Sequence, residues 1–396
     1  MSPRLPDGEP APADGALPRE SLARLGARPF GVYVHVPFCA ARCGYCDFNT
    51  YVPGDGISPD GFAGAVAAEA ALAARVLGGT LPPADTVFLG GGTPTLLPAR
   101  DLAAILAAIP RAAGAEVTVE ANPETIDAPL LEALLEAGVT RLSLGMQSAA
   151  PHVLAALDRR HTPGRAVAAA RAARAAGFAH VSLDLIYGGP GESDADWAAS
   201  LDAALAAGVD HVSAYALTVE PGTRLHAQVR RGAVAAPDDD VPARRYRAAD
   251  AALAAAGLDW YELSSWAAEP GARCAHNVGY WRSHDWWGIG PGAHSHVGGV
   301  RWWNVLHPAR WAERVAAGRS PAAGREILTP EQRRTEQTML ELRLVEGLPI
   351  AGADAPAATA LAVEGLLVSG ALAAGVARLT LDGRLLADHV ARTLLG

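Results

Sequence analysis

Three of the four cysteines lie within eight residues, as Cys39, Cys43 and Cys46, and this cluster constrains the chain more than any other feature. Such spacing is a poor disulfide framework for 396 residues and is typical of a metal site in a reducing compartment. Three thiolates can converge at this spacing if the chain wraps around its target, and an iron–sulfur cube is large enough to be wrapped. A tetrahedral zinc ion with a histidine as fourth ligand is the alternative, although the paired gaps of a zinc knuckle are missing. Three unrelated buried thiols are the third interpretation.

The composition excludes several classes of function. The 33 basic and 42 acidic residues give a net charge of -9, which argues against nucleic-acid binding and against a polybasic membrane anchor. Every basic residue is arginine, so a catalytic lysine is excluded. Residues 1–28 are rich in Pro, Gly and charge and lack the apolar core of a signal peptide, so we predict a disordered N-terminal arm. No apolar run reaches the roughly 18 residues of a membrane span, and we expect a cytoplasmic protein.

From about Pro29, short β-branched or alternating runs alternate with Ala- and Leu-rich stretches of helical period. The pattern predicts strands over 31–36, 86–90, 116–120, 140–145, 180–187 and 211–216, and helices near 59–77, 100–109, 127–137, 164–176, 194–207 and 241–256. This alternation requires right-handed crossovers and a parallel sheet, either doubly wound or closed into a full or partial barrel. No GxGxxG follows the first strand, and polar residues collect after the strand ends, which favours an α/β barrel over 29–258.

The rest of the chain has a different character. Seven of the nine tryptophans lie within 259–304, so we expect the aromatic-rich segment over 259–325 to cover something apolar or to bind something flat. Residues 326–396 become helical again and close on the alternating run ARLTLDGRLLADHV. Two or three helices followed by a small hairpin predict a compact winged-helix-like domain. No basic recognition face is visible in it, so we do not expect a DNA reader.

The cysteine motif resembles a known family. CxxxCxxC directly after the first strand of a βα series is similar to the signature of radical S-adenosylmethionine proteins, whose fold is a partial (β/α)6 barrel of the TIM type. The surrounding YVHVPFCAARCGYCDF resembles the coproporphyrinogen dehydrogenase-like subfamily, and the likeness runs to about residue 310 and more loosely beyond. The resemblance implies a [4Fe-4S] cluster on Cys39, Cys43 and Cys46. The methionyl amino and carboxylate groups of S-adenosylmethionine would then chelate the fourth iron.

The same resemblance implies a set of cofactor contacts at the carboxyl ends of the strands. By that likeness, Arg159 would pair with the cofactor carboxylate. Glu120, Gln147 and Asp184 would take the amino group and the ribose hydroxyls, and the glycine motif GGGTPT would hold the methionyl end. We therefore expect S-adenosylmethionine to contact Tyr33, Gly91, Gly92, Thr93, Glu120, Gln147, Arg159 and Asp184.

Two features divide the subfamily. The dehydrogenase carries a further cysteine two residues after the third cluster ligand, whereas this chain has Phe48 there. The run HNVGYW over 276–281 is similar to the HNxxYW motif of a heme-chaperone branch, in which imidazole can coordinate iron while aromatic faces cover the macrocycle. The resemblance implies a heme site made by His276 as iron ligand with Asn277, Tyr280 and Trp281.

Other groups in the same segment are alternatives. His284, His294 and His296 are rival iron ligands, and Arg301 is a candidate partner for a porphyrin propionate. Cys274 lies two residues before His276 and is either a buried free thiol or a group that touches the heme edge.

The sequence thus leaves two hypotheses for the function. The first is a heme chaperone that binds heme, a [4Fe-4S] cluster and S-adenosylmethionine and passes heme to an acceptor protein. This hypothesis is compatible with peripheral association of the chaperone with a membrane through that acceptor. The alternative is an oxygen-independent coproporphyrinogen III dehydrogenase. Neither hypothesis involves nucleic acid. A third possibility, a zinc-stabilised structural protein, would give a colourless preparation rather than the brown of an iron–sulfur cluster.

Overall fold

The computed structural model describes residues 5–236, 238, 240–350 and 352–396. Six parallel strands form its centre, and their order in the sheet is their order in the sequence. Side chains from all six strands line one cavity, so the sheet curves into the partial barrel that the sequence predicts. The strands are β1 (Phe30–Val36), β2 (Ala84–Gly91), β3 (Arg111–Ala121), β4 (Arg141–Gln147), β5 (His180–Tyr187) and β6 (His211–Ala216).

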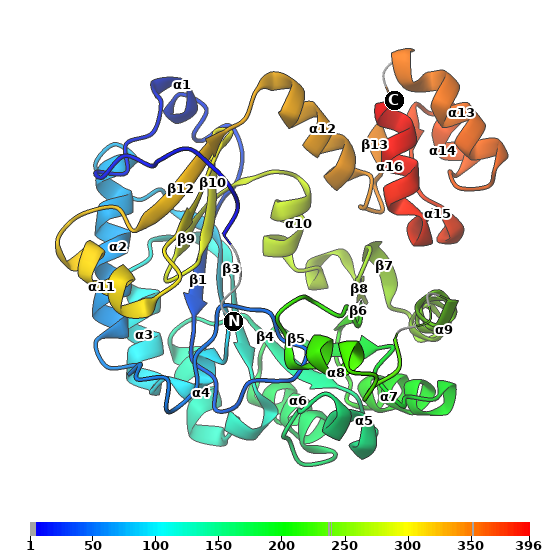
Figure 1. The fold of residues 1–396 in the computed structure, drawn as a ribbon, viewed down its shortest axis with the longest axis horizontal. Helices are drawn as coiled ribbons and strands as arrows, with labels where there is room; N and C mark the ends of the chain where they lie inside the picture. Colours follow the sequence, from blue (N-terminus) through cyan, green and yellow to red (C-terminus); the bar gives the residue numbers. More distant parts are fainter. Residues whose placement is uncertain (1–4, 237, 239, 351) are drawn as a thin grey trace.

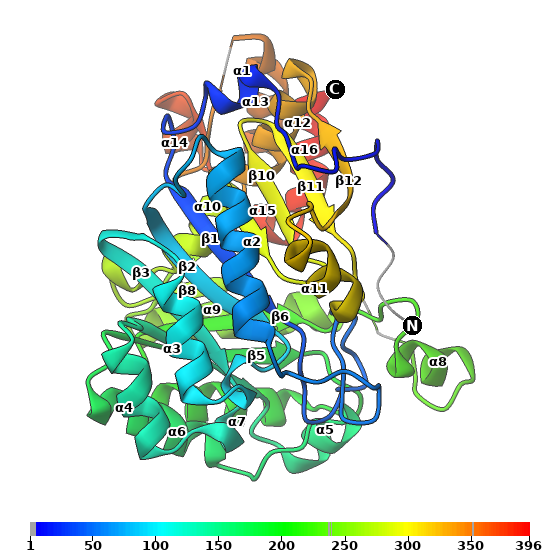
Figure 2. The ribbon, with the colours of Figure 1, turned by 90° about the vertical axis from the view of Figure 1, so that its left-hand side faces the viewer.

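Helices cover the outer face of this barrel, and Figure 2 shows α2 and α3 lying across it. All six predicted helices are present, as α2 (Phe62–Val76), α3 (Ala99–Ala107), α4 (Ala128–Glu136), α6 (Arg165–Ala176), α7 (Asp194–Ala206) and α9 (Asp240–Ala255). Alternate strand residues such as Val34, Leu89 and Leu144 are fully buried. Four short elements were not predicted: α5 (Pro151–Ala156), α8 (Arg224–Arg230), η1 (Pro94–Leu96) and η2 (Pro123–Thr125).

The aromatic-rich segment extends the sheet at both edges. On the β1 side, β9 (Asp285–Ile289) is parallel to β1 and is followed by the antiparallel strands β10 (His294–Val297), β11 (Val300–Asn304) and β12 (Ala322–Ile327). On the β6 side lie β8 (Ser265–Ala267) and β7 (Asp259–Glu262). The intervening helices are η3 (Pro270–Ala272), α10 (Ala275–Trp281) and α11 (Pro308–Ala316). Trp266, Trp287, Trp302 and Trp303 are buried, so most of the aromatic surface covers the protein's own core.

The predicted disorder of the N-terminal arm is wrong for residues 5–28. Glu9 and Arg325 exchange two backbone hydrogen bonds of 2.9 Å, and the Arg325 Nε donates to the Glu9 carboxylate at 2.7 Å. The short helix α1 (Arg19–Leu22) lies between Leu17 and Leu25, which both pack against the central core. The arm is polar, but the free edge of β12 offers it backbone partners that composition does not reveal.

The C-terminal unit has a small core of its own, and Figure 1 shows α12 leading to it from β12. It comprises α12 (Pro330–Glu341), β13 (Leu348–Pro349), η4 (Gly352–Asp354), α13 (Ala355–Val363), α14 (Ser369–Ala373), β14 (Val376–Ala377), α15 (Leu381–Leu385) and α16 (Ala387–Leu395). The closing hairpin is a wrong prediction, because β14 pairs with β13 and the terminal run is helical. The Thr380 side chain caps α15, and Val390 and Leu394 are buried at helical spacing. Among the described residues, no helix combines the length and apolar character needed to cross a bilayer.

Candidate functional site

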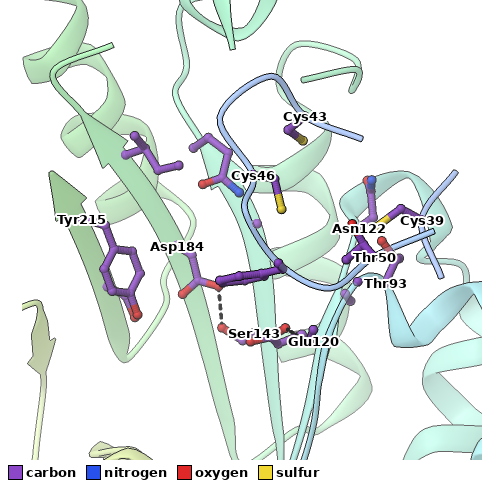
Figure 3. A pocket seen from close by; sticks show the side chains of 18 of the residues that line it. Cys39, Cys43, Cys46, Thr50, Thr93, Glu120, Asn122, Ser143, Asp184 and Tyr215 are labelled. Atoms are coloured by element: carbon purple, nitrogen blue, oxygen red, sulfur yellow. Dashed lines mark hydrogen bonds between the residues drawn. The ribbon is translucent and has the colours of Figure 1, made fainter. Parts of the chain in front are cut away.

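The three clustered cysteines lie on one loop between β1 and α2, at the carboxyl end of the parallel strands. Backbone hydrogen bonds fix this loop, from Cys39 N to Tyr51 O at 2.9 Å and from Gly44 N to Leu157 O at 3.0 Å. Figure 3 shows the loop beside the strands that carry Glu120, Ser143 and Asp184. All three cysteines are half-buried and line a cavity of about 870 Å³ that continues into the barrel. The structure therefore brings the predicted thiols together over one lumen.

Burial affects the protonation of the clustered thiols. Within the part of the chain that the structure describes, no three His, Cys, Asp or Glu side chains converge closely enough to hold one metal ion. Burial raises the pKa of Cys39, and it raises the pKa of Cys46 to about 11. Ligation would therefore release protons from these thiols.

The glycine motif packs directly against the cysteine loop. The Gly92 N donates to Val36 O at 2.8 Å, and the Thr93 N donates to Phe38 O at 2.7 Å. A Cβ on Gly92 would lie 2.5 Å from the carbonyl oxygen of Phe38, a distance that real side chains do not adopt. The close approach that requires glycine here is between β2 and the loop. The predicted contact of Gly91, Gly92 and Thr93 with a cofactor remains a prediction.

The guanidinium group of Arg159 places a positive charge beside the cysteine thiols. Its Nη2 donates to Gly145 O at 3.0 Å, and its Nη1 lies 3.7 Å from Cys43 Sγ. The Nε is buried without a hydrogen-bond partner, as is the Oγ1 of Thr50 on the cysteine loop. Gln147 ends β4 in the left-handed region, with φ of 65°, and lines the same cavity. The pairing of Arg159 with a cysteine was not predicted, because the two residues lie 116 positions apart.

Two carboxyl groups face the lumen below the loop. Glu120 at the end of β3 accepts from Gly91 N at 3.0 Å, and Asp184 on β5 accepts from Ser143 Oγ at 2.8 Å. Burial and the charge of Asp184 raise the pKa of Glu120 to about 7, and burial raises the pKa of Asp184. The Tyr33 hydroxyl reaches the same lumen and lies 3.0 Å from Nδ1 of His35. The lining also includes residues that were not predicted, which alternate along the strands with core residues: Thr118, Ser143, Ser182, Ser213 and Tyr215.

The raised pKa of Glu120 predicts a pH dependence of stability. The folded chain binds the proton more tightly than the unfolded chain, whose glutamate has a pKa of 4.5, so this stabilisation is complete below pH 4.5 and is lost as pH rises through 7. The Glu120→Gln variant keeps the acceptor for Gly91 N but cannot ionise at this position. We expect the free energy of unfolding of wild type relative to Glu120→Gln to fall by roughly 2–3 kcal/mol between pH 5 and pH 8. Urea unfolding of the cofactor-free chain measures this, and equal pH profiles for the two chains would contradict it.

The HNVGYW run forms α10 at the other end of the barrel, near the starts of β2 and β3. The His276 Nδ1 lies 2.8 Å from Thr86 Oγ1, and its Nε2 lies 2.9 Å from the Tyr280 hydroxyl. The imidazole is buried and stacks on Phe88 with a centroid distance of 5.2 Å. Burial lowers the pKa of His276 to about 3, so the ring is neutral at physiological pH. Iron ligation by His276 would therefore replace one of two existing hydrogen bonds.

Glu116 on β3 anchors α10. Its carboxylate accepts from the backbone N–H groups of Ala275 and His276, both at 3.0 Å, and from Arg141 Nε at 3.1 Å. The buried Cys274 thiol lies 3.6 Å from the same carboxylate. Cys274, His276, Asn277 and Tyr280 line the floor of the large cavity, far along the barrel from the cysteine loop.

The remaining heme candidates are dispersed. The Trp281 side chain hydrogen-bonds Glu262. The Arg301 guanidinium pairs with Glu326 at 2.6 Å and Glu336 at 2.7 Å, so its charge is already matched. The structure does not bring Arg301 and Trp281 into one site with His276.

Comparisons with known proteins identify similar sequences and a similar fold. Residues 33–204 match the Radical SAM superfamily. The heme chaperone HemW of Mycobacterium tuberculosis (strain ATCC 25618 / H37Rv) is 54% identical over 381 residues, which are 95% of this chain and 97% of that protein. HemW of Synechocystis sp. is 37% identical over 81% of this chain and 79% of that protein. Coproporphyrinogen III oxidase (HemN) from Escherichia coli, a radical SAM enzyme, shares the fold with a TM-score of 0.80 at 22% identity, over 95% of this chain and 92% of that chain.

Proposed function

The chain belongs to the HemW family of the radical SAM superfamily, and on that premise we propose that it binds heme and transfers it to an acceptor protein. In this proposal Cys39, Cys43 and Cys46 hold a [4Fe-4S] cluster, and S-adenosylmethionine occupies the upper part of the lumen. The observation that carries the proposal is the arrangement of three thiols on one fixed loop over a barrel lumen, with α10 and its histidine closing the other end.

The residues present fit the cluster and the cofactor. The buried and unpartnered Nε of Arg159 and Oγ1 of Thr50 provide hydrogen-bonding groups for an anionic ligand beside the thiols. Bound S-adenosylmethionine would supply two chelating donors to an open iron and a reducible sulfonium group. Glu120, whose pKa is raised to about 7, can accept from an amino group or hold a proton in the lumen. Gln147, Asp184, Tyr33 and the glycine motif complete the proposed cofactor site.

Heme is proposed to bind through the segment that contains HNVGYW. His276 and Tyr280 form an edge-to-face pair with a centroid distance of 4.9 Å, and aromatic rings of this kind can cover a flat macrocycle. Asn277 and Trp281 belong to the same helix. The proposal places the carrier in the cytoplasm, with membrane association only through the acceptor, and treats the C-terminal unit over 326–396 as a winged-helix-like appendage.

Phe48 separates the chaperone from the dehydrogenase. Its side chain is 58% exposed and lines the mouth of the lumen, at the position where the dehydrogenase subfamily has a thiol. A phenyl ring cannot transfer a proton or donate a hydrogen atom as a thiol can. The observation therefore disfavours oxidative decarboxylation of coproporphyrinogen III.

One anaerobic experiment on the reconstituted chain tests the two functions together. We expect heme titration to give saturable binding, and we expect coproporphyrinogen III with S-adenosylmethionine and a reductant to give no decarboxylated product. Product formation would overturn the chaperone proposal. A wild-type chain that binds no heme would do the same.

A further inference from the structure

A second cavity, of about 400 Å³, lies on the outer side of α10. His276 and Tyr280 line both this outer cavity and the lumen, so α10 is a partition between the two. The Tyr280 ring also packs edge-to-face on Trp286 at 4.7 Å, which extends the aromatic row into the outer cavity. The volume of this cavity is within the range of small-molecule sites. An open cavity of this size would leave part of a bound porphyrin exposed. Partial exposure suits a carrier, because a carrier has to release its heme.

The outer cavity contains a histidine that is better placed for ligation than His276. His284 lines it, is half-buried, and its imidazole makes no hydrogen bond or ion pair with any residue that the structure describes. Burial and the nearby arginines Arg282 and Arg28 lower the pKa of His284, so the ring is in the neutral form that coordinates metals. Both ring nitrogens of His276 are already occupied.

The backbone holds His284 in this position. The His284 N donates to Gly279 O at 2.8 Å, and the preceding Ser283 has φ of 50°, in the left-handed region. This is the Schellman ending of α10, with serine at the position that glycine normally occupies. A Cβ on Gly279 would lie 3.3 Å from Nδ1 of His284, so the glycine of HNVGYW gives the ring room to pack on the helix. Main-chain hydrogen bonding thus fixes the backbone of His284, and its ring nitrogens make no hydrogen bond with the residues that the structure describes.

Two arginines beside the cavity already hold a carboxylate. Arg273 Nη1 lies 2.7 Å from the Glu346 carboxylate, and Arg282 Nη2 lies 3.6 Å from it. Both arginines line the outer cavity, and Glu346 lies on the segment that links α12 to β13. All three side chains are partly exposed, so another carboxylate can compete for the same guanidinium groups.

We propose that heme docks in the outer cavity, with His284 as the axial ligand of its iron and Arg273 and Arg282 receiving a propionate in place of Glu346. The inference rests on the proposed heme-carrier function and specifies its site. It assigns His276 a positioning role, in which the ring holds Tyr280 and Thr86 at the wall of the cavity.

The test is a heme difference titration on the full-length, cluster-reconstituted chain. We expect His284→Ala to weaken heme binding by about tenfold or more and to shift the Soret band, because the iron loses its protein ligand. His284→Met would replace imidazole by a thioether and should give a different low-spin spectrum at the same site. His389→Ala, on exposed α16, is the control imidazole and should keep the wild-type affinity and spectrum.

The outcomes distinguish a failure of the proposed heme site from a failure of the proposed heme-carrier function. Absence of heme binding by wild type would overturn the carrier function itself. Binding by wild type with unchanged affinity and spectrum in both His284 variants would overturn the assignment of the ligand while the function stands. Glu346→Gln should tighten heme binding a few fold, because it frees two guanidinium groups. Unchanged or weaker heme binding by that variant would contradict the proposal that a propionate replaces Glu346 on the two arginines.

Discussion

Cys43→Ala is expected to leave a nearly colourless chain after anaerobic reconstitution, with iron falling from about four atoms per chain to fewer than one. The cluster would keep only two thiolates, and the Arg159 Nη1 that lies 3.7 Å from Cys43 Sγ would lose its partner. S-adenosylmethionine affinity should fall with the cluster, because the open iron is its proposed chelation point. Iron and sulfide analysis, with the visible absorbance of the cluster, measures the effect.

Cys274→Ser is the matched control. This fourth cysteine lies at the floor of the lumen, 3.6 Å from Glu116, and a serine hydroxyl can make the same contact. Cys274→Ser should therefore retain full iron content. If Cys43→Ala kept its cluster while Cys274→Ser lost it, the proposed ligand set would be wrong.

The barrel could be predicted because its strands are buried on both faces. Runs such as Val32–Val36 and Leu142–Leu144 are almost continuously buried, and each is separated from the next by a helix with one apolar side. The Trp-rich segment was harder to interpret. β9 and β11 are only five residues long, and three of their four tryptophans are buried in the core, so the composition of the segment resembles that of a ligand platform.

The parts of the site that could be predicted are those encoded locally. The spacing of Cys39, Cys43 and Cys46 lies within one loop, and the HNVGYW run lies within one helix. The hydrogen-bonding of a side chain is not local. The two partners of His276 include Thr86, 190 residues away, and Arg141 meets Glu116 across neighbouring strands, 25 residues away. Sequence therefore identified the histidine but not whether its nitrogens were free.

The contact between Glu116 and Arg141 leads to the second large prediction, which concerns stability. The Arg141 side chain is 1% exposed and that of Glu116 is 11% exposed, with 3.1 Å between Nε and the carboxylate. Glu116→Ala would leave a buried guanidinium without its counter-charge, and the N–H groups of Ala275 and His276 would lose their acceptor. Breaking one side of a buried ion pair costs about 3–5 kcal/mol. We expect a decrease of that size in the free energy of unfolding, measured by urea denaturation.

A double-mutant cycle gives this prediction its sharpest form. Replacing both partners, as Glu116→Ala with Arg141→Leu, removes the unpaired charge, so the double variant should be more stable than Glu116→Ala alone by roughly 1–3 kcal/mol. Asp382→Ala, whose pair with Arg247 is about half exposed on both sides, should cost less than about 1 kcal/mol. Additive costs for Glu116 and Arg141 would show that the pair is not coupled. Because Glu116 holds the amino end of α10, the single variant should also weaken heme binding. The double variant should regain part of the lost stability without restoring the anchor of that helix.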